Sequence, residues 1–298
     1  MAADDDRVGV IGLGLMGAPI VRRLAECGRD VVAHSRRHSS FDAVAEAATW
    51  AGSPAEVAAC PTILLSLPAD EQVVGVTEAL LPHLRPGAVV IDTSTTHPDT
   101  ARRLAAALTE VGAGFVDAPV SGGPTAAAAG TLSTMVGGDP DAVTAARPTL
   151  DAVADRITVI GGPGAGQVAK ACNQAIVGTT INAVAEALAL AQRNGADPGA
   201  VRAALLGGYA SSRVLELHGR RMLDDDLEPG GRVATQLKDL GIVADLAERS
   251  AAAMPVTAAA RQRYGELVDA GHADLDHAAV WLLTRADGLP RPTPPTRA

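Results

Sequence analysis

The chain has 298 residues, of which 47% are hydrophobic and 20% charged, and its formal net charge is −9 at pH 7. These proportions exclude a wholly disordered chain, and the acidic balance argues against a general nucleic-acid-binding protein, which normally has a basic surface. The length predicts about two domains of ~150 residues each. Because aromatic residues make up only 2% of the chain, we expect an aliphatic core.

Short apolar runs alternate with helical segments in the first half of the chain. A helix follows the first strand and ends near Glu26, and helical segments follow the third and fourth strands. The predicted strands span residues 7–11, 30–34, 62–67, 88–91, 114–118, 134–136 and 158–160. Such alternation is typical of βαβ units and a mostly parallel sheet, so we predict an α/β fold for residues 1–164.

The pattern changes after residue 164, where apolar residues recur at helical spacing and strand signals end. The predicted helices span residues 167–193, 199–206, 237–247, 255–270 and 276–283. The first would be ~40 Å long at a rise of 1.5 Å per residue, a length that favours a helix linking two domains. We therefore expect an all-helical domain over residues 165–288. Residues 289–298 contain four prolines and are predicted to be a disordered tail.

A glycine-rich turn joins the first strand to the first helix. Its sequence is Gly12, Leu13, Gly14, Leu15, Met16 and Gly17. The first glycine allows a tight turn, the second lets the backbone approach a pyrophosphate, and the third lets the helix pack closely on the sheet. This GxGxxG spacing often marks nothing more than a turn. Here the turn follows a strand and opens a helix, which is the context that indicates dinucleotide binding at the helix N-terminus.

The end of the second strand favours NADP over NAD as the cofactor. NAD-binding proteins place a carboxylate there for the ribose hydroxyl. This chain has Ser35, Arg36 and Arg37 instead. Arginine binds phosphate through a planar fork of donors, which suits the 2′-phosphate of NADP. The alternative is that these arginines belong to a solvated loop.

Two further segments carry candidate catalytic chemistry. Ser121, Gly122 and Gly123 end a predicted strand and would present a hydroxyl and backbone N–H groups to a carboxylate, although an ordinary glycine-rich turn has the same composition. Lys170 and Asn173 are three positions apart and share one helix face. A solvated lysine is the ordinary alternative. Against it, Lys170 and Lys238 are the only lysines among 25 basic residues, so solvated positions in this chain are usually arginine.

Together these segments resemble the β-hydroxyacid dehydrogenase family, in the right order and over roughly residues 7–285. The resemblance rests on the glycine turn, the segment 117–123 with Gly130-Thr131-Leu132, the segment 164–174 and Lys238-Asp239-Leu240. It implies an N-terminal Rossmann domain, an all-helical second domain and an active site between them. It implies the following roles: Lys170 as catalytic acid and base, Asn173 as its helper, Ser121, Gly122 and Gly123 as carboxylate binders, Leu67, Pro68 and Thr95 as cofactor contacts, and Lys238 near both cofactor and substrate.

The resemblance implies an NADP-dependent oxidoreductase that interconverts a small β-hydroxy acid and its semialdehyde. The segment 207–213, with Gly230 and residues 238–241, is closer to tartronate semialdehyde (2-hydroxy-3-oxopropionate) reductase than to 3-hydroxyisobutyrate dehydrogenase. Gln174 stands where the isobutyrate enzymes usually carry a second asparagine. The alternatives are 3-hydroxyisobutyrate dehydrogenase and a non-catalytic NADP-binding module. Imine reductases share the fold but usually replace the catalytic lysine.

Other features predict a cytoplasmic protein without a metal. Three cysteines fit neither a disulfide framework nor a metal pair, and the seven histidines include no HExxH motif. The acidic N-terminus leads directly into a strand and does not resemble a signal peptide. Polar residues interrupt the alanine-rich stretch 165–192, so we expect no membrane span. We expect a homodimer or homotetramer formed through the helical domain.

Overall fold

The computed structural model describes residues 6–285, and the predicted tail at 289–298 lies outside them. The chain divides into two compact units after Lys170, and helix α7 (Ala165–Arg193) continues from the first into the second. Each unit has its own apolar core.

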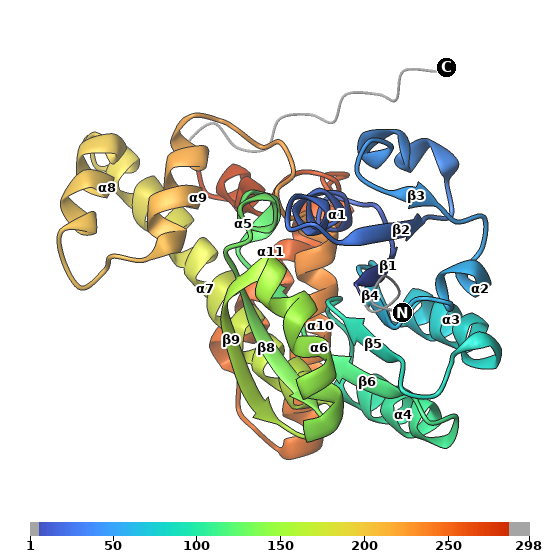
Figure 1. Ribbon diagram of the computed structural model, residues 1–298. Coiled ribbons are helices and arrows are strands. Elements are labelled where there is room, and N and C mark those ends of the chain that lie inside the picture. The colour runs from blue at the N-terminus through green and yellow to red at the C-terminus, as the bar shows by residue number, and fades with distance from the viewer. Residues whose placement is uncertain (1–5, 286–298) are drawn as a thin grey trace. The chain divides into compact units, whose positions relative to one another are not determined.

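A mostly parallel sheet forms the centre of the first unit (Figure 1). Its strands are β1 (Arg7–Ile11), β2 (Asp30–His34), β3 (Thr49–Trp50), β4 (Thr62–Leu65), β5 (Val89–Asp92), β6 (Gly114–Asp117), β7 (Val120–Ser121), β8 (Leu132–Gly138) and β9 (Ala154–Gly161). The strand order is β3-β2-β1-β4-β5-β6-β8-β7, with β9 also paired to β8. The first six strands are parallel, whereas β8 runs antiparallel to β6 and β7.

Helices cover both faces of this sheet, because successive strand residues point to opposite sides. Helices α1 (Gly17–Glu26), α5 (Gly123–Ala129) and α6 (Pro140–Val153) pack on the face that receives Val8, Val10 and Leu64. Helices α2 (Pro54–Val57), α3 (Asp70–Leu80) and α4 (Pro98–Glu110) pack on the face that receives Ile63 and Leu65. Short 3₁₀ segments complete the unit at η1 (His38–Ser40), η2 (Asp42–Val44) and η3 (Leu81–His83).

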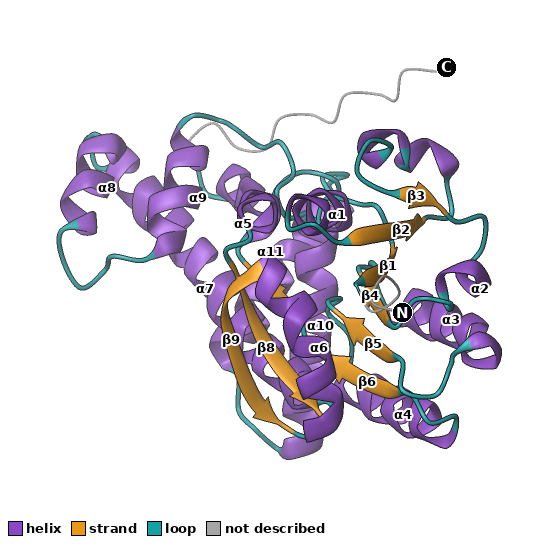
Figure 2. Cartoon of the chain, in the orientation of Figure 1, coloured by secondary structure: helices purple, strands orange, loops and turns teal. Residues whose placement is uncertain are grey.

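The second unit is helical throughout its described part, apart from a single bridge between Arg232 and Asp276 (Figure 2). After α7 it contains α8 (Pro198–Leu206), α9 (Arg213–Leu223), α10 (Val233–Ser250), α11 (Pro255–Asp269) and the 3₁₀ helix η4 (His277–Leu283). Its core combines aliphatic side chains from these helices with two aromatic ones, Tyr264 and Trp281. The predicted fold, an α/β Rossmann-type domain followed by a helical domain, is confirmed.

Several predicted boundaries need correction. The strand predicted over 62–67 ends at Leu65, and the helix predicted over 276–283 is of the 3₁₀ type. Strands β3 and β7 and helices α2, α5, α6 and α9 were not predicted. Two-residue strands carry no detectable alternation, and their pairing comes from the neighbouring strand. Helix α5, by contrast, has local signals: a proline near its start, an alanine run, and Gly130 in the left-handed conformation at its end.

Within residues 6–285, α7 is the one helix that is long and apolar enough to cross a membrane by length and composition, with a mean hydropathy of 1.3 over an 18-residue window. Half of that window is buried within the protein, and core helices of soluble proteins meet the same criterion.

Candidate active site

The predicted cofactor residues follow four adjacent parallel strands, at their carboxyl ends. The strand order reverses between β1 and β4, and open α/β sheets bind ligands outside such a switch point. The loops are joined by backbone hydrogen bonds, from Gly12 to His34 and from Ser66 to Ile11, each 2.9 Å long. The loop residues are Gly12–Gly17 after β1, Ser35–Arg37 after β2, Leu67 and Pro68 after β4, and Thr95 after β5.

The glycine turn has a conformation that larger residues cannot adopt. Gly12 has a φ of 102°, in the left-handed region. A Cβ atom on Gly17 would collide with the carbonyl oxygen of Gly12, whereas a Cβ on Gly14 would meet nothing within 4 Å. Helix α1 has no acidic residue in its first turn, so no carboxylate there competes for its free N–H groups. The turn therefore fits a pyrophosphate at the start of α1.

The loop after β2 presents uncompensated positive charge. Arg36 and Arg37 are exposed, and neither forms an ion pair within residues 6–285. The adjacent rings of His38 and Trp50 are in edge contact, with centroids 4.6 Å apart. An exposed guanidinium group can bind a phosphate group through two parallel hydrogen bonds.

Lys170 lies against the segment that carries Ser121. Its side chain is 7% exposed, and its Nζ donates a 2.8 Å hydrogen bond to the carbonyl of Val120. Gly122 and Gly123 follow with φ values of 133° and 72°, which glycine adopts without strain. The structure thus brings the predicted proton donor beside the predicted carboxylate-binding segment, although the two are about fifty residues apart in the chain.

Asn173 and Lys238 belong to a polar network in the second unit. Asn173 donates to Oε1 of Gln174 at 2.8 Å, and Gln174 donates to Oδ2 of Asp239 at 2.6 Å. The Nζ of Lys238 lies 3.0 Å from Oδ1 of Asp239. Because Asn173 is three positions after Lys170 on one helix, both side chains project from the same side of α7.

Two buried carboxylates at the carboxyl ends of β5 and β6 were not predicted as functional. Asp92 and Asp117 are neighbours in the register of β5 and β6. Burial raises the pKa of Asp92 to about 7, with hydrogen bonds from Ser94 opposing this rise. Burial also raises the pKa of Asp117 to about 6, against backbone hydrogen bonds that include those of Gly164 and Gln167. The sequence signal was available, since each aspartate is the last residue of an apolar strand.

The second unit contains a cluster that motif searching missed. His218, Asp276 and His277 place potential metal ligand atoms within 4.8 Å of one another. The carboxylate of Asp276 is already bound by the Arg221 guanidinium at 3.0 Å and by the backbone N–H groups of Gly230, Gly231 and Ala278. A bound Arg⁺ opposes a second cation at the same carboxylate. We therefore read the cluster as structural, and the absence of a metal remains a prediction.

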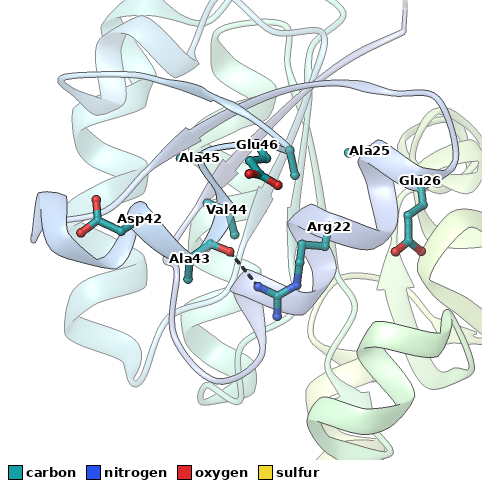
Figure 3. Close-up of a pocket in the computed structure, with 9 residues that line it drawn as sticks. Arg22, Ala25, Glu26, Asp42, Ala43, Val44, Ala45 and Glu46 are labelled. Atoms are coloured by element: carbon teal, nitrogen blue, oxygen red, sulfur yellow. Dashed lines mark hydrogen bonds between the residues drawn. The ribbon is translucent and has the colours of Figure 1, made fainter.

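A hollow of about 530 Å³ lies between α1 and the segment Asp42–Ala47 (Figure 3). Arg22 crosses it and donates to the carbonyl of Ala43 at 2.9 Å. Three carboxylates line it, on Glu26, Asp42 and Glu46, and none of the predicted site residues does. The hollow is therefore not part of the candidate site.

Comparisons with known proteins agree with this geometry. The model for the NAD binding domain of 6-phosphogluconate dehydrogenase matches residues 7–161. The model described as NAD-binding of NADP-dependent 3-hydroxyisobutyrate dehydrogenase matches residues 164–283.

Individual relatives match over nearly the whole chain. The chain is 36% identical to the 2-hydroxy-3-oxopropionate reductase of Escherichia coli strain K12, over 92% of this chain and 95% of that protein. It is 34% identical to the NAD-dependent L-serine dehydrogenase of Pseudomonas aeruginosa, over 93% and 97%. A crystal structure of 3-hydroxyisobutyrate dehydrogenase from Salmonella typhimurium matches with a TM-score of 0.86 and 31% identity, over 92% and 98%. The chain therefore belongs to the β-hydroxyacid dehydrogenase family and is an oxidoreductase that binds a nicotinamide dinucleotide.

Proposed function

We propose that the protein is an NADP-dependent reductase of a small semialdehyde that carries a carboxylate, with 2-hydroxy-3-oxopropionate as its substrate. The observation that carries the proposal is the contact between Lys170 Nζ and the Val120 carbonyl, directly before Ser121. It supports a site in which one group moves a proton and the adjoining segment holds an acid. The 36% identity to the Escherichia coli reductase supports the choice of substrate.

Each residue has a defined task in this reaction. A bound NADPH supplies the hydride to the aldehyde carbon. The hydroxyl of Ser121 and the backbone N–H groups of Gly122 and Gly123 hold the substrate carboxylate. The ammonium of Lys170 then gives a proton to the developing alkoxide, and the neutral amine accepts it in the reverse reaction. Asn173, on the same side of α7, orients the substrate hydroxyl.

The preference for NADP is tested by replacing Arg36 with alanine. We expect the Kd for NADPH to rise by about 10- to 100-fold, because a charge-assisted bond to the 2′-phosphate contributes roughly 1.5–3 kcal/mol. The Kd for NADH should change by less than about twofold, since NADH lacks that phosphate. Fluorescence titration of both cofactors measures the two constants.

Arg147→Ala is the matched control, because it removes an exposed arginine that pairs with Asp151 on α6. This variant should leave both constants unchanged. A small, equal effect of Arg36→Ala on the two cofactors would contradict the NADP assignment.

The substrate is tested by following NADPH oxidation with a panel of short semialdehydes. We expect kcat/KM to be highest for 2-hydroxy-3-oxopropionate, by at least about tenfold over the semialdehyde of 3-hydroxyisobutyrate, because a site that hydrogen-bonds a hydroxyl discriminates against a substrate that lacks it. The reverse order would identify a 3-hydroxyisobutyrate dehydrogenase. Tight NADPH binding, with no turnover of any semialdehyde and no oxidation of L-serine or threonate with NADP⁺, would favour a non-catalytic module.

A further inference from the structure

The start of α7 is held by a buried carboxylate. Asp117 is the last residue of β6 and is fully buried. Its Oδ1 accepts the N–H of Gly164 at 2.7 Å, and its Oδ2 accepts the N–H of Gln167 at 3.0 Å. The first N–H groups of a helix have no partner inside the helix, and a negative charge there is favoured by the helix dipole. Asp117 therefore fixes where and in which direction the helix begins.

Two glycines make this attachment close. A Cβ on Gly166 would collide with the carbonyl oxygen of Met135 and lie 2.8 Å from Oδ2 of Asp117. A Cβ on Gly137 would lie 2.7 Å from both Oδ1 of Asp117 and the backbone nitrogen of Gly166. The first turn of α7 thus sits on β6 and β8 with no room for a side chain between them, so it has little freedom to shift.

The side chain of Gln167 joins the same helical turn to the loop after β5. Its Oε1 accepts the N–H of Thr96 at 3.1 Å, and its Nε2 donates to the carbonyl of Ser94 at 2.8 Å. The side chain is 1% exposed, so these bonds are made away from water. The amide therefore holds the loop on both sides of Thr95, the predicted cofactor contact.

Lys170 follows Gln167 by three residues, a rise of about 4.5 Å along the helix. We propose that Asp117 and Gln167 are positioning residues that set the Lys170 ammonium relative to the cofactor loop at Thr95. This inference rests on the proposed function, in which Lys170 is the proton donor. Reactions of this kind are sensitive to such placement, because a displacement of about 1 Å can lower the rate about 100-fold.

The first test uses Asp117→Asn and Gln167→Leu. In Asp117→Asn, the side-chain NH₂ group cannot accept a hydrogen bond, so one of the two bonds from the N–H groups of Gly164 and Gln167 is lost. In Gln167→Leu, both side-chain hydrogen bonds, to Thr96 and Ser94, are lost. We expect kcat to fall by about 10- to 100-fold. The Kd for NADPH should stay within about twofold, and the solvent deuterium isotope effect on kcat should increase because proton transfer becomes slower. In a Lys170→Met background, the same substitutions should change kcat by less than about threefold.

A second readout does not depend on activity. Because the chain has two lysines, labelling with [ε-¹³C]lysine gives one signal from Lys170 and one from Lys238. We expect both variants to shift or broaden the Lys170 signal and leave the Lys238 signal in place. Failure of the proposed function would appear separately, as wild-type turnover by Lys170→Met, and would not alter this spectroscopic result.

Leu108→Ala is the control for a general loss of stability. Leu108 is buried in α4 of the same unit and lies in the apolar core. This variant should lower the Tm and leave kcat and the Lys170 signal unchanged. An unchanged Lys170 signal in both test variants would overturn the proposal. So would an equal fall in kcat in the wild-type and Lys170→Met backgrounds.

Discussion

Replacing Lys170 with methionine or arginine is expected to lower kcat by about 10²- to 10⁴-fold, the usual contribution of a placed general acid or base. Methionine removes the proton, whereas arginine keeps the charge but cannot release a proton, because its pKa exceeds 12. Loss of activity in both variants would therefore identify proton transfer, and not charge, as the task of Lys170. Steady-state assays of NADPH oxidation give kcat, and fluorescence titration should show that NADPH still binds.

Glu186→Gln provides the matched control, since Glu186 is an exposed charged residue on the same helix. It should retain wild-type kcat. If Lys170→Arg turned over semialdehyde at a rate near that of the wild type, Lys170 would not be the proton donor.

Replacing Asp276 with alanine is expected to lower the stability of the second unit substantially. Asp276 is fully buried and accepts hydrogen bonds from Arg221, Gly230, Gly231 and Ala278. Removing its carboxylate leaves three N–H groups without an acceptor and takes one of the acceptors of Arg221, which keeps its contacts with Asp226 and Glu228. We expect the free energy of unfolding of the second unit to fall by about 3–5 kcal/mol, because each buried donor left without a partner costs about 1–3 kcal/mol. Urea denaturation measures this change.

The tryptophans allow the second unit to be followed separately. Trp281 lies in η4 and Trp50 in the first unit, so fluorescence in a Trp50→Phe background reports on Trp281. Asp274→Ala is the control, because Asp274 is 89% exposed and its pairing with Arg232 should contribute less than about 1 kcal/mol. A loss below about 1 kcal/mol for Asp276→Ala would contradict the structural role.

The contribution of the Asp276 carboxylate to the free energy of unfolding should depend on pH in a defined direction. Burial opposes ionisation, but the imidazole of His218, 3.6 Å from Oδ1, the charge of His277 and the backbone N–H groups of Ala278 and Gly231 hold the pKa of Asp276 well below its ordinary value. A lowered pKa means that the stabilisation is present above the ordinary value of 3.8 and is lost as the pH falls toward the folded-state pKa. The difference between wild type and Asp276→Ala should therefore persist unchanged at neutral pH and shrink only in strong acid.

Local sequence determined much of the fold. The predicted strands at 7–11 and 30–34 have the observed bounds of β1 and β2, and the helix between them ends at Glu26 as predicted. Glycine spacing and apolar alternation act between residues close in the chain, so one sequence contains the information. The long helix α7 was found for the same reason. Helix α9 was missed although Ser212 caps its first turn and its buried residues Leu215, Gly219 and Met222 recur at helical spacing.

For the candidate site too, some features were predicted from the sequence and others are seen only in the tertiary structure. Lys170, Ser121 and the glycine turn were identified from motifs, since each motif lies within a few residues. The tertiary structure decided which of them touch: the hydrogen bond from Lys170 to Val120 joins residues about fifty positions apart. The attachments of Asp117 and Gln167 likewise join strand ends to a helix that starts much later in the chain.

The sequence by itself therefore determined the fold class, and it predicted the cofactor loop and Lys170 as the proton donor. The packing of β6, β8 and α7 decided how that donor is held, and the folding of the second unit decided that His218, Asp276 and His277 meet. The physical reason is the separation along the chain of the residues that interact. Turn geometry and helix periodicity depend on neighbours in the chain, whereas desolvation, carboxylate pairing and helix attachment depend on groups that become neighbours only when the chain has folded.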